Sequence, residues 1–117
     1  MLNDARTRLW LRRAFFVFAA FAFVMALLPK PPEFPGAPGD KVQHMIAFFT
    51  LASLAAAGWR ERTVPALLAW LAVFGAAIEL FQAIPGLHRY ADVVDWYADM
   101  GAALAALVLV RLALPRL

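Results

Sequence analysis

Residues 64–84 read VPALLAWLAVFGAAIELFQAI, an apolar stretch that is broken only by Glu79 and Gln82. At about 1.5 Å per residue, a helix of this length reaches roughly 30 Å, the thickness of the hydrocarbon core of a bilayer. Three more apolar stretches flank it in the chain. The sequence therefore predicts an all-α membrane protein, a four-transmembrane-helix bundle in one domain (residues 1–117), with helices at about 9–28, 41–59, 64–84 and 93–114.

The composition supports a membrane protein over a soluble one. The chain is 64% hydrophobic and 16% charged, whereas soluble domains average nearer half apolar and a quarter charged. The absence of cysteine excludes disulfides, thiolate metal sites and cysteine nucleophiles. The net charge of +3 does not indicate nucleic-acid binding, because the basic residues lie at the ends of apolar segments rather than along one face.

Proline, glycine and charged residues separate the four predicted helices. Residues 29–32 (PKPP) end the first helix, and residues 35–39 (PGAPG) form a loop by composition. Residues 60–63 (RERT) predict a tight charged turn, with Pro65 in the first turn of the next helix. Pro85 and Gly86 end the third helix.

The first apolar stretch allows a second interpretation. The sequence Arg12-Arg13-Ala14-Phe15-Phe16 loosely resembles a twin-arginine export signal, and the fifteen apolar residues 14–28 fit a signal core. No small-x-small cleavage site directly follows Leu28, which favours an uncleaved membrane helix with a basic flank.

The basic residues predict that both termini are cytoplasmic. With the N-terminus inside, Lys30, Lys41 and Arg89 lie outside. Eight arginines then lie inside: Arg6, Arg8, Arg12, Arg13, Arg60, Arg62, Arg111 and Arg116. This is a clear positive-inside bias over short loops.

Polar residues in three of the helices recur at helical spacing and at similar depth in the outer half. Asp40 and His44 share a side of the second helix, and Glu79 and Gln82 share a side of the third. Charged groups that face lipid cost several kcal/mol, so these sides should face one another. The sequence predicts a polar pocket, open to the outside, formed by Asp40, Lys41, His44, Glu79, Gln82, Arg89, Asp92, Asp95 and Asp99. The catalytic candidates are Glu79, Asp99 and His44; no metal ligand set is assigned and no cofactor is indicated.

Each of these residues also has a structural interpretation. Asp40 precedes Gln43 by three residues, so it fits a helix N-cap with a capping-box partner, and Asp92 with Asp95 fits the same pattern. Glu79 lies inside an apolar helix, where neither capping nor solvation explains it. Its structural alternative is an ion pair with Lys41 or Arg89.

The polar blocks resemble the VanZ-like family of small membrane proteins. The matching segments are residues 40–44 (DKVQH) with Phe48, residues 79–82 (ELFQ), Pro85-Gly86 with Arg89, and residues 92–95 (DVVD) with Asp99 and Gly101. They span residues 40–107, and their order and spacing are specific. Members often carry Asn where this chain has Asp99. The resemblance implies a bacterial membrane protein with an outward polar site, in a family named after low-level resistance to the glycopeptide teicoplanin.

Three functions follow from these features. The first is binding or processing of a cell-envelope component, such as a lipid-linked or cell-wall precursor, by a multi-pass protein of the bacterial cytoplasmic membrane. The second is a membrane-embedded metal-dependent enzyme that uses His44 and the carboxylates, although no compact metal motif is present. The third is a small proton-coupled exporter, which ranks last because the first predicted helix has no carboxylate. The partner is expected to be a membrane lipid or an envelope precursor, and a homo-oligomer is compatible with the sequence.

Overall fold

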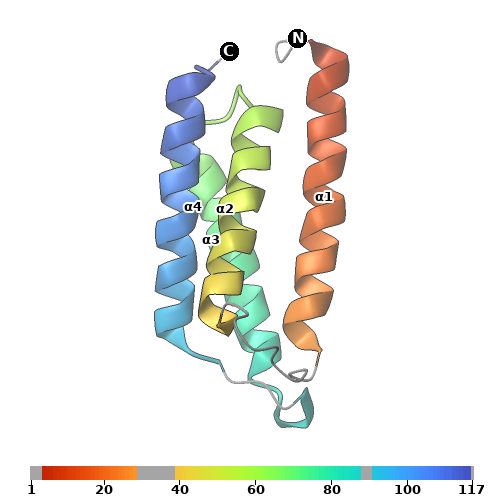
Figure 1. Cartoon of the computed structure of the whole chain (residues 1–117), viewed down its shortest axis with the longest axis vertical. Helices are drawn as coiled ribbons and strands as arrows, with labels where there is room; N and C mark the ends of the chain where they lie inside the picture. Colours follow the sequence, from red (N-terminus) through yellow and green to blue (C-terminus); the bar gives the residue numbers. More distant parts are fainter. Residues whose placement is uncertain (1–3, 29–38, 88–90, 117) are drawn as a thin grey trace.

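The computed structural model of the chain describes residues 4–28, 39–87 and 91–116. Within these ranges the chain forms four α-helices and one short 3-10 helix, with no strand (Figure 1). Their bounds are α1 Ala5–Leu27, α2 Asp40–Gly58, α3 Val64–Gln82, η1 Pro85–Leu87 and α4 Val93–Ala113. The predicted all-α architecture with four helices is confirmed, and most helix ends lie within two residues of the predicted ones.

Short polar side chains begin three of the four helices. Asp4 accepts a hydrogen bond from the backbone N–H of Arg6 (3.0 Å), which starts α1 four residues before the predicted start. Thr63 caps α3, whose first turn holds Pro65, and Asp92 caps α4 by accepting from the N–H of Val94 (2.9 Å). The prediction that Asp40 is an N-cap is wrong. Gly39 takes the extended cap conformation and its carbonyl accepts from Gln43, so Asp40 is the first helical residue.

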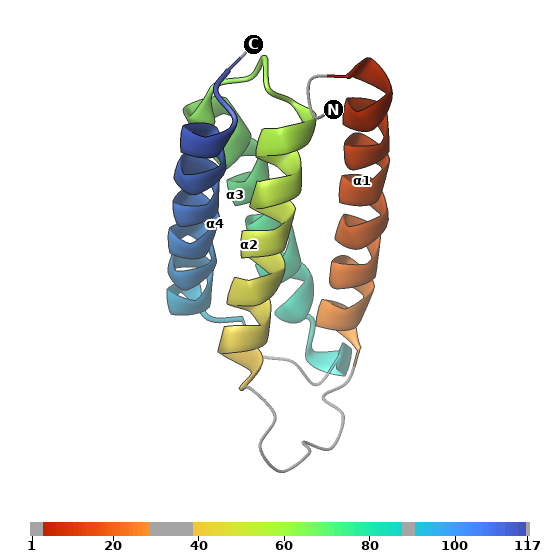
Figure 2. The same ribbon diagram turned by 45° about the horizontal axis from the view of Figure 1, so that its top comes forward.

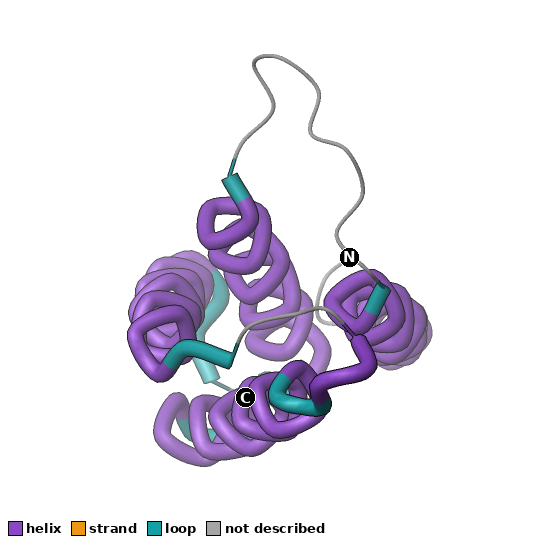
Figure 3. The backbone as a smooth tube through the Cα atoms, turned by 90° about the horizontal axis from the view of Figure 1, so that it is seen from below, coloured by secondary structure: helices purple, strands orange, loops and turns teal. Residues whose placement is uncertain are grey.

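The chain runs up and down the bundle, so that both termini and the α2–α3 turn lie at one end (Figure 2). Viewed end-on, the four helices surround a common axis (Figure 3). The parallel pair α2 and α4 makes the most extensive interface, while α1 packs chiefly on α2 and α3 chiefly on α4. Helix α2 thus has the most extensive contacts with the rest of the bundle.

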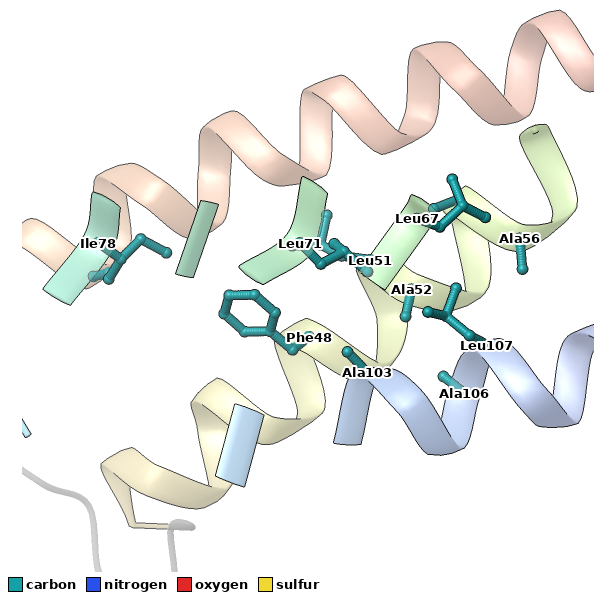
Figure 4. Packing of buried hydrophobic residues seen from close by; sticks show 12 residues of the cluster. Phe48, Leu51, Ala52, Ala56, Leu67, Leu71, Ile78, Ala103, Ala106 and Leu107 are labelled. Carbon is teal, nitrogen blue, oxygen red and sulfur yellow. The ribbon is translucent and has the colours of Figure 1, made fainter. Parts of the chain in front are cut away.

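The core consists of large apolar side chains and alanines in equal numbers (Figure 4). Leu51, Leu71 and Leu107 are fully buried. Small residues let helix backbones approach closely, which suits the α2–α4 interface. The alanines there have no exposed surface: Ala52, Ala56, Ala103 and Ala106.

The outside of the bundle is apolar. Trp70, Leu80 and Leu112 are each about three-quarters exposed, and large apolar side chains are exposed on every helix. Helices α1, α3 and α4 are long and apolar enough to cross a membrane. Helix α2 is less apolar, because its first turn carries Lys41, Gln43 and His44. The exposed apolar surface and the three long helices support a membrane protein.

Candidate functional site

Polar side chains gather at the end of the bundle opposite the termini. There α2 and α4 begin and α3 ends. We call this region the acidic end and define it by Lys41, His44, Glu79, Asp92, Asp95 and Asp99. The Asp40 side chain and Arg89, which the sequence also assigned to this region, lie outside the described residues.

Glu79 links the end of α3 to the start of α4. Its Oε2 accepts a hydrogen bond from the backbone N–H of Asp92 at 2.8 Å. The side chain of Asp92 at the same time accepts from Val94. In a capping box the reciprocal acceptor lies three residues into the same helix. Here a residue of the preceding helix takes that place, so capping does account for one role of Glu79, which sequence spacing did not reveal.

Lys41 and Asp95 join the starts of α2 and α4. Lys41 Nζ lies 3.5 Å from Asp95 Oδ1, and the Asp95 side chain is 21% exposed. Asp95 is therefore an ion-pair partner rather than the capping-box partner of Asp92. The carboxylate that Lys41 meets is that of Asp95, whereas the sequence suggested Glu79. Salt bridges at this exposure are weak, so the pair positions the two helices more than it stabilises them.

Other charged groups surround the Glu79 carboxylate. His44 on α2 and Asp95 on α4 both lie close enough to act on it through space. Asp99 is one helical turn deeper than Asp95 and is only 3% exposed. The structure thus places two of the predicted catalytic candidates, His44 and Glu79, near each other, with Asp99 buried below them.

Gln82 differs from the rest of the predicted site. It is 3% exposed, and its Nε2 donates to the backbone carbonyl of Ala26 at 2.9 Å. That carbonyl belongs to the last turn of α1, which lacks intrahelical donors. Gln82 therefore attaches α1 to α3.

No group of three or more histidine and carboxylate side chains is placed to hold a metal ion among the residues that the structure describes. A metal-dependent enzyme needs such a ligand set. The geometry of the described side chains gives this alternative no support.

The acidic end rests on a tightly packed layer of aromatic residues. Trp96 donates its Nε1–H to the backbone carbonyl of Ala72 at 3.1 Å. A Cβ atom at Gly75 would lie 3.1 Å from Trp96, 3.3 Å from Met100 and 3.3 Å from Phe48. Gly75 therefore allows three helices to meet directly below the polar groups. Gly75 precedes Glu79 by four residues and so lies on the same side of α3.

The opposite end is held together by arginines that donate to backbone carbonyls. Arg60 is 5% exposed and donates through Nε and Nη2 to Pro115 O at 3.1 and 2.7 Å. Arg111 donates to Arg62 O and Arg116 to Glu61 O. Sequence analysis interpreted these arginines only as determinants of orientation. In the structure they also fasten the α2–α3 turn to the end of α4, and we call this region the arginine end.

Arg12 attaches α1 to the arginine end. Its Nη2 lies 2.8 Å from Glu61 Oε1, and its Nε–H donates to Gly58 O at 2.7 Å. The guanidinium also lies 5.2 Å from the centre of the Trp59 ring. Gly58 permits this approach, since a Cβ there would lie 3.4 Å from the Arg12 backbone nitrogen.

Comparisons with family models, curated proteins and solved structures give no match to this chain. The resemblance to the VanZ-like family therefore stays a prediction. The case for a function rests on the geometry of the acidic end.

Proposed function

We propose that the chain is a four-span protein of the bacterial cytoplasmic membrane, of the VanZ-like type, that binds or processes an amphipathic envelope component at its acidic end. One observation carries the proposal. Charged and polar side chains from three helices meet at one end of a bundle whose sides expose apolar residues. An amphipathic ligand has the same division, with a polar head and an apolar tail. Lipid-linked and cell-wall precursors belong to this chemical class.

The position of α2 supports its role as the fourth span. It is 19 residues long, which at about 1.5 Å per residue approaches the roughly 30 Å of a bilayer core. It contacts all three other helices. Its first turn is exposed at the end of the bundle, where Lys41 pairs with Asp95 of α4, so these polar groups fit a position at the membrane surface rather than in the lipid core.

The distribution of arginines supports a cytoplasmic arginine end. Four arginines donate hydrogen bonds to backbone carbonyls at the end of the bundle that holds both termini (Figure 2): Arg12, Arg60, Arg111 and Arg116. Basic residues near membrane helices are retained on the cytoplasmic side. The acidic end is then outside the cell, where envelope precursors are used.

The topology predicts which end a membrane-impermeant thiol reagent reaches. The chain has no cysteine, so each introduced cysteine is unique. We expect Gly86→Cys in intact cells to be labelled from outside, and Glu61→Cys to be labelled only after the membrane is permeabilised. Gly86 is exposed and has open space around its Cα. External labelling of position 61 with protection of position 86 would refute the orientation.

The charges of the acidic end indicate the kind of head group. Among the described side chains of the acidic end, Glu79, Asp92, Asp95 and Asp99 outnumber Lys41 and His44, so a head group that carries an amine fits best. Buried or partly buried carboxylates of this kind need a compensating positive charge. The peptide or amino-sugar part of a cell-wall precursor supplies amines of this type.

Binding of a lipid-linked cell-wall precursor to the chain in nanodiscs tests the proposal. We expect Asp95→Asn to weaken binding about tenfold, the effect of losing roughly 1.4 kcal/mol of charge-assisted contact. The matched control is Glu61→Gln, which removes one carboxylate at the other end and should leave binding unchanged. Equal binding by parent, Asp95→Asn and Glu61→Gln would contradict a site at the acidic end.

A further inference from the structure

The outer face of α1 carries arginines that take no part in the described contacts of the arginine end. Arg6 and Arg13 are exposed, and neither has a carboxylate or carbonyl partner for its side chain among the described residues. Arg12, next in sequence to Arg13, is instead engaged with Glu61 and Gly58. Arg12 therefore faces the bundle, whereas Arg13 lies on the outer face of the same helix.

Helical geometry places these residues on one stripe that points away from the bundle. Arg6, Trp10 and Arg13 are spaced i, i+4 and i+7 and so share a face of α1. The inward side chains, Phe15 and Phe18 among them, lie on the opposite face and pack against the core. Figure 1 shows α1 standing at the edge of the bundle, so nothing in the described chain covers the stripe.

Arg13 and Trp10 form a cationic site, and Arg6 lies on the same stripe roughly 10 Å nearer the start of the helix. The Arg13 guanidinium lies 5.1 Å from the centre of the Trp10 ring, and Trp10 is 59% exposed. Tryptophan is enriched at the membrane–water interface, and arginine binds phosphate with several donors. This part of the stripe is therefore suited to a phosphate group at the level of lipid head groups.

Below the cationic site the same stripe becomes apolar. Val17, Phe21 and Val24 continue it and are 72%, 59% and 55% exposed. Arg13 and Val24 are eleven residues apart, or about 16 Å along the helix. Half of a bilayer core is about 15 Å thick. The stripe from Arg13 to Val24 thus has about the length of an acyl chain in one leaflet, and its apolar part from Val17 to Val24 covers roughly 10 Å of that.

We propose that the outer face of α1 is a binding site for an anionic phospholipid, with its phosphate at Arg6 and Arg13 and one acyl chain along Val17, Phe21 and Val24. The proposal rests on the membrane placement given above, but not on the ligand of the acidic end. The charge of the stripe favours an anionic lipid over a zwitterionic one. Each arginine near an anionic head group contributes a factor of about five in affinity.

Native mass spectrometry of the detergent-solubilised chain tests this site, with phosphatidylglycerol and phosphatidylcholine as probes. We expect the parent to retain phosphatidylglycerol in preference. The double variant Arg6→Gln/Arg13→Gln should bind it about thirtyfold more weakly, with phosphatidylcholine binding unchanged. Arg6→Lys/Arg13→Lys, which keeps both charges, should keep the preference.

Arg12→Gln is the matched control, because it removes the neighbouring charge from the inward face. It should lower stability and still retain phosphatidylglycerol. The site is overturned if the glutamine double variant keeps the full preference, if the parent shows none, or if inorganic phosphate displaces the lipid. None of these measurements involves the acidic end, so failure here is distinguishable from failure of the proposed function.

Discussion

Gly75→Leu is expected to lower the free energy of unfolding by about 3 kcal/mol, the largest stability effect of any single change considered for this chain. The first added carbon would already lie 3.1–3.3 Å from Trp96, Met100 and Phe48. Three more carbons would push these side chains apart where α2, α3 and α4 meet. The hydrogen bond from Trp96 to Ala72 would be lost at the same time. Unfolding in mixed detergent micelles, followed by circular dichroism, measures the effect.

Gly101→Leu provides the matched control. Gly101 lies within α4, is exposed, and has no atom within 4 Å of an added Cβ. Both substitutions replace glycine in a helix with a strong helix former, which alone gains roughly 1 kcal/mol. The difference between the two variants therefore isolates packing. Equal stability of the two variants would contradict the close contact at Gly75.

Glu79→Gln is expected to weaken ligand binding strongly while leaving stability unchanged or slightly raised. The glutamine oxygen can still accept from the N–H of Asp92, so the cap on α4 remains. Loss of the negative charge relieves repulsion from Asp92 and Asp95, which lie nearby. A charge-assisted contact to a cationic head group is worth up to about 3 kcal/mol, so binding of the lipid-linked precursor should weaken about 100-fold.

Glu79→Leu separates the capping role from the binding role. It removes the acceptor as well as the charge, and loss of a helix cap costs about 1 kcal/mol. We therefore expect the leucine variant to be less stable than the glutamine variant, with binding strongly weakened in both. A glutamine variant that unfolds much more readily than the parent but still binds the precursor would leave Glu79 with a purely structural role.

The helices were predictable because apolar length and chain breaks are local signals. The end of α2 at Gly58 and the start of α3 at Val64 follow from the charged turn between them. The early start of α1 was missed because the Asp4 cap carries the helix beyond its apolar residues. The N-cap of α2 was also predicted wrongly. Gly39, in the extended conformation, is the N-cap residue, and Asp40 is the first residue of the helix.

The contacts of the site were less predictable, because they depend on which helices become neighbours. Spacing placed His44, Glu79 and Asp99 at a similar depth and predicted that the polar residues converge, and the structure places His44, Asp92 and Asp95 around Glu79. It could not show that Asp92 donates to Glu79, since those residues lie on different helices. The backbone carbonyls that accept from Arg60 and Gln82 could not be predicted either. Every residue carries a carbonyl, and the sequence does not distinguish one from another.

The extensive interface between α2 and α4 has a consequence for how the protein is synthesised. On the four-span arrangement, α2 emerges from the ribosome second, yet its most extensive partner, α4, is synthesised last. Unlike α1, α3 and α4, it is not among the described helices that are long and apolar enough to cross a membrane by themselves. The α2–α4 interface can therefore form only after the last helix of the bundle has been synthesised.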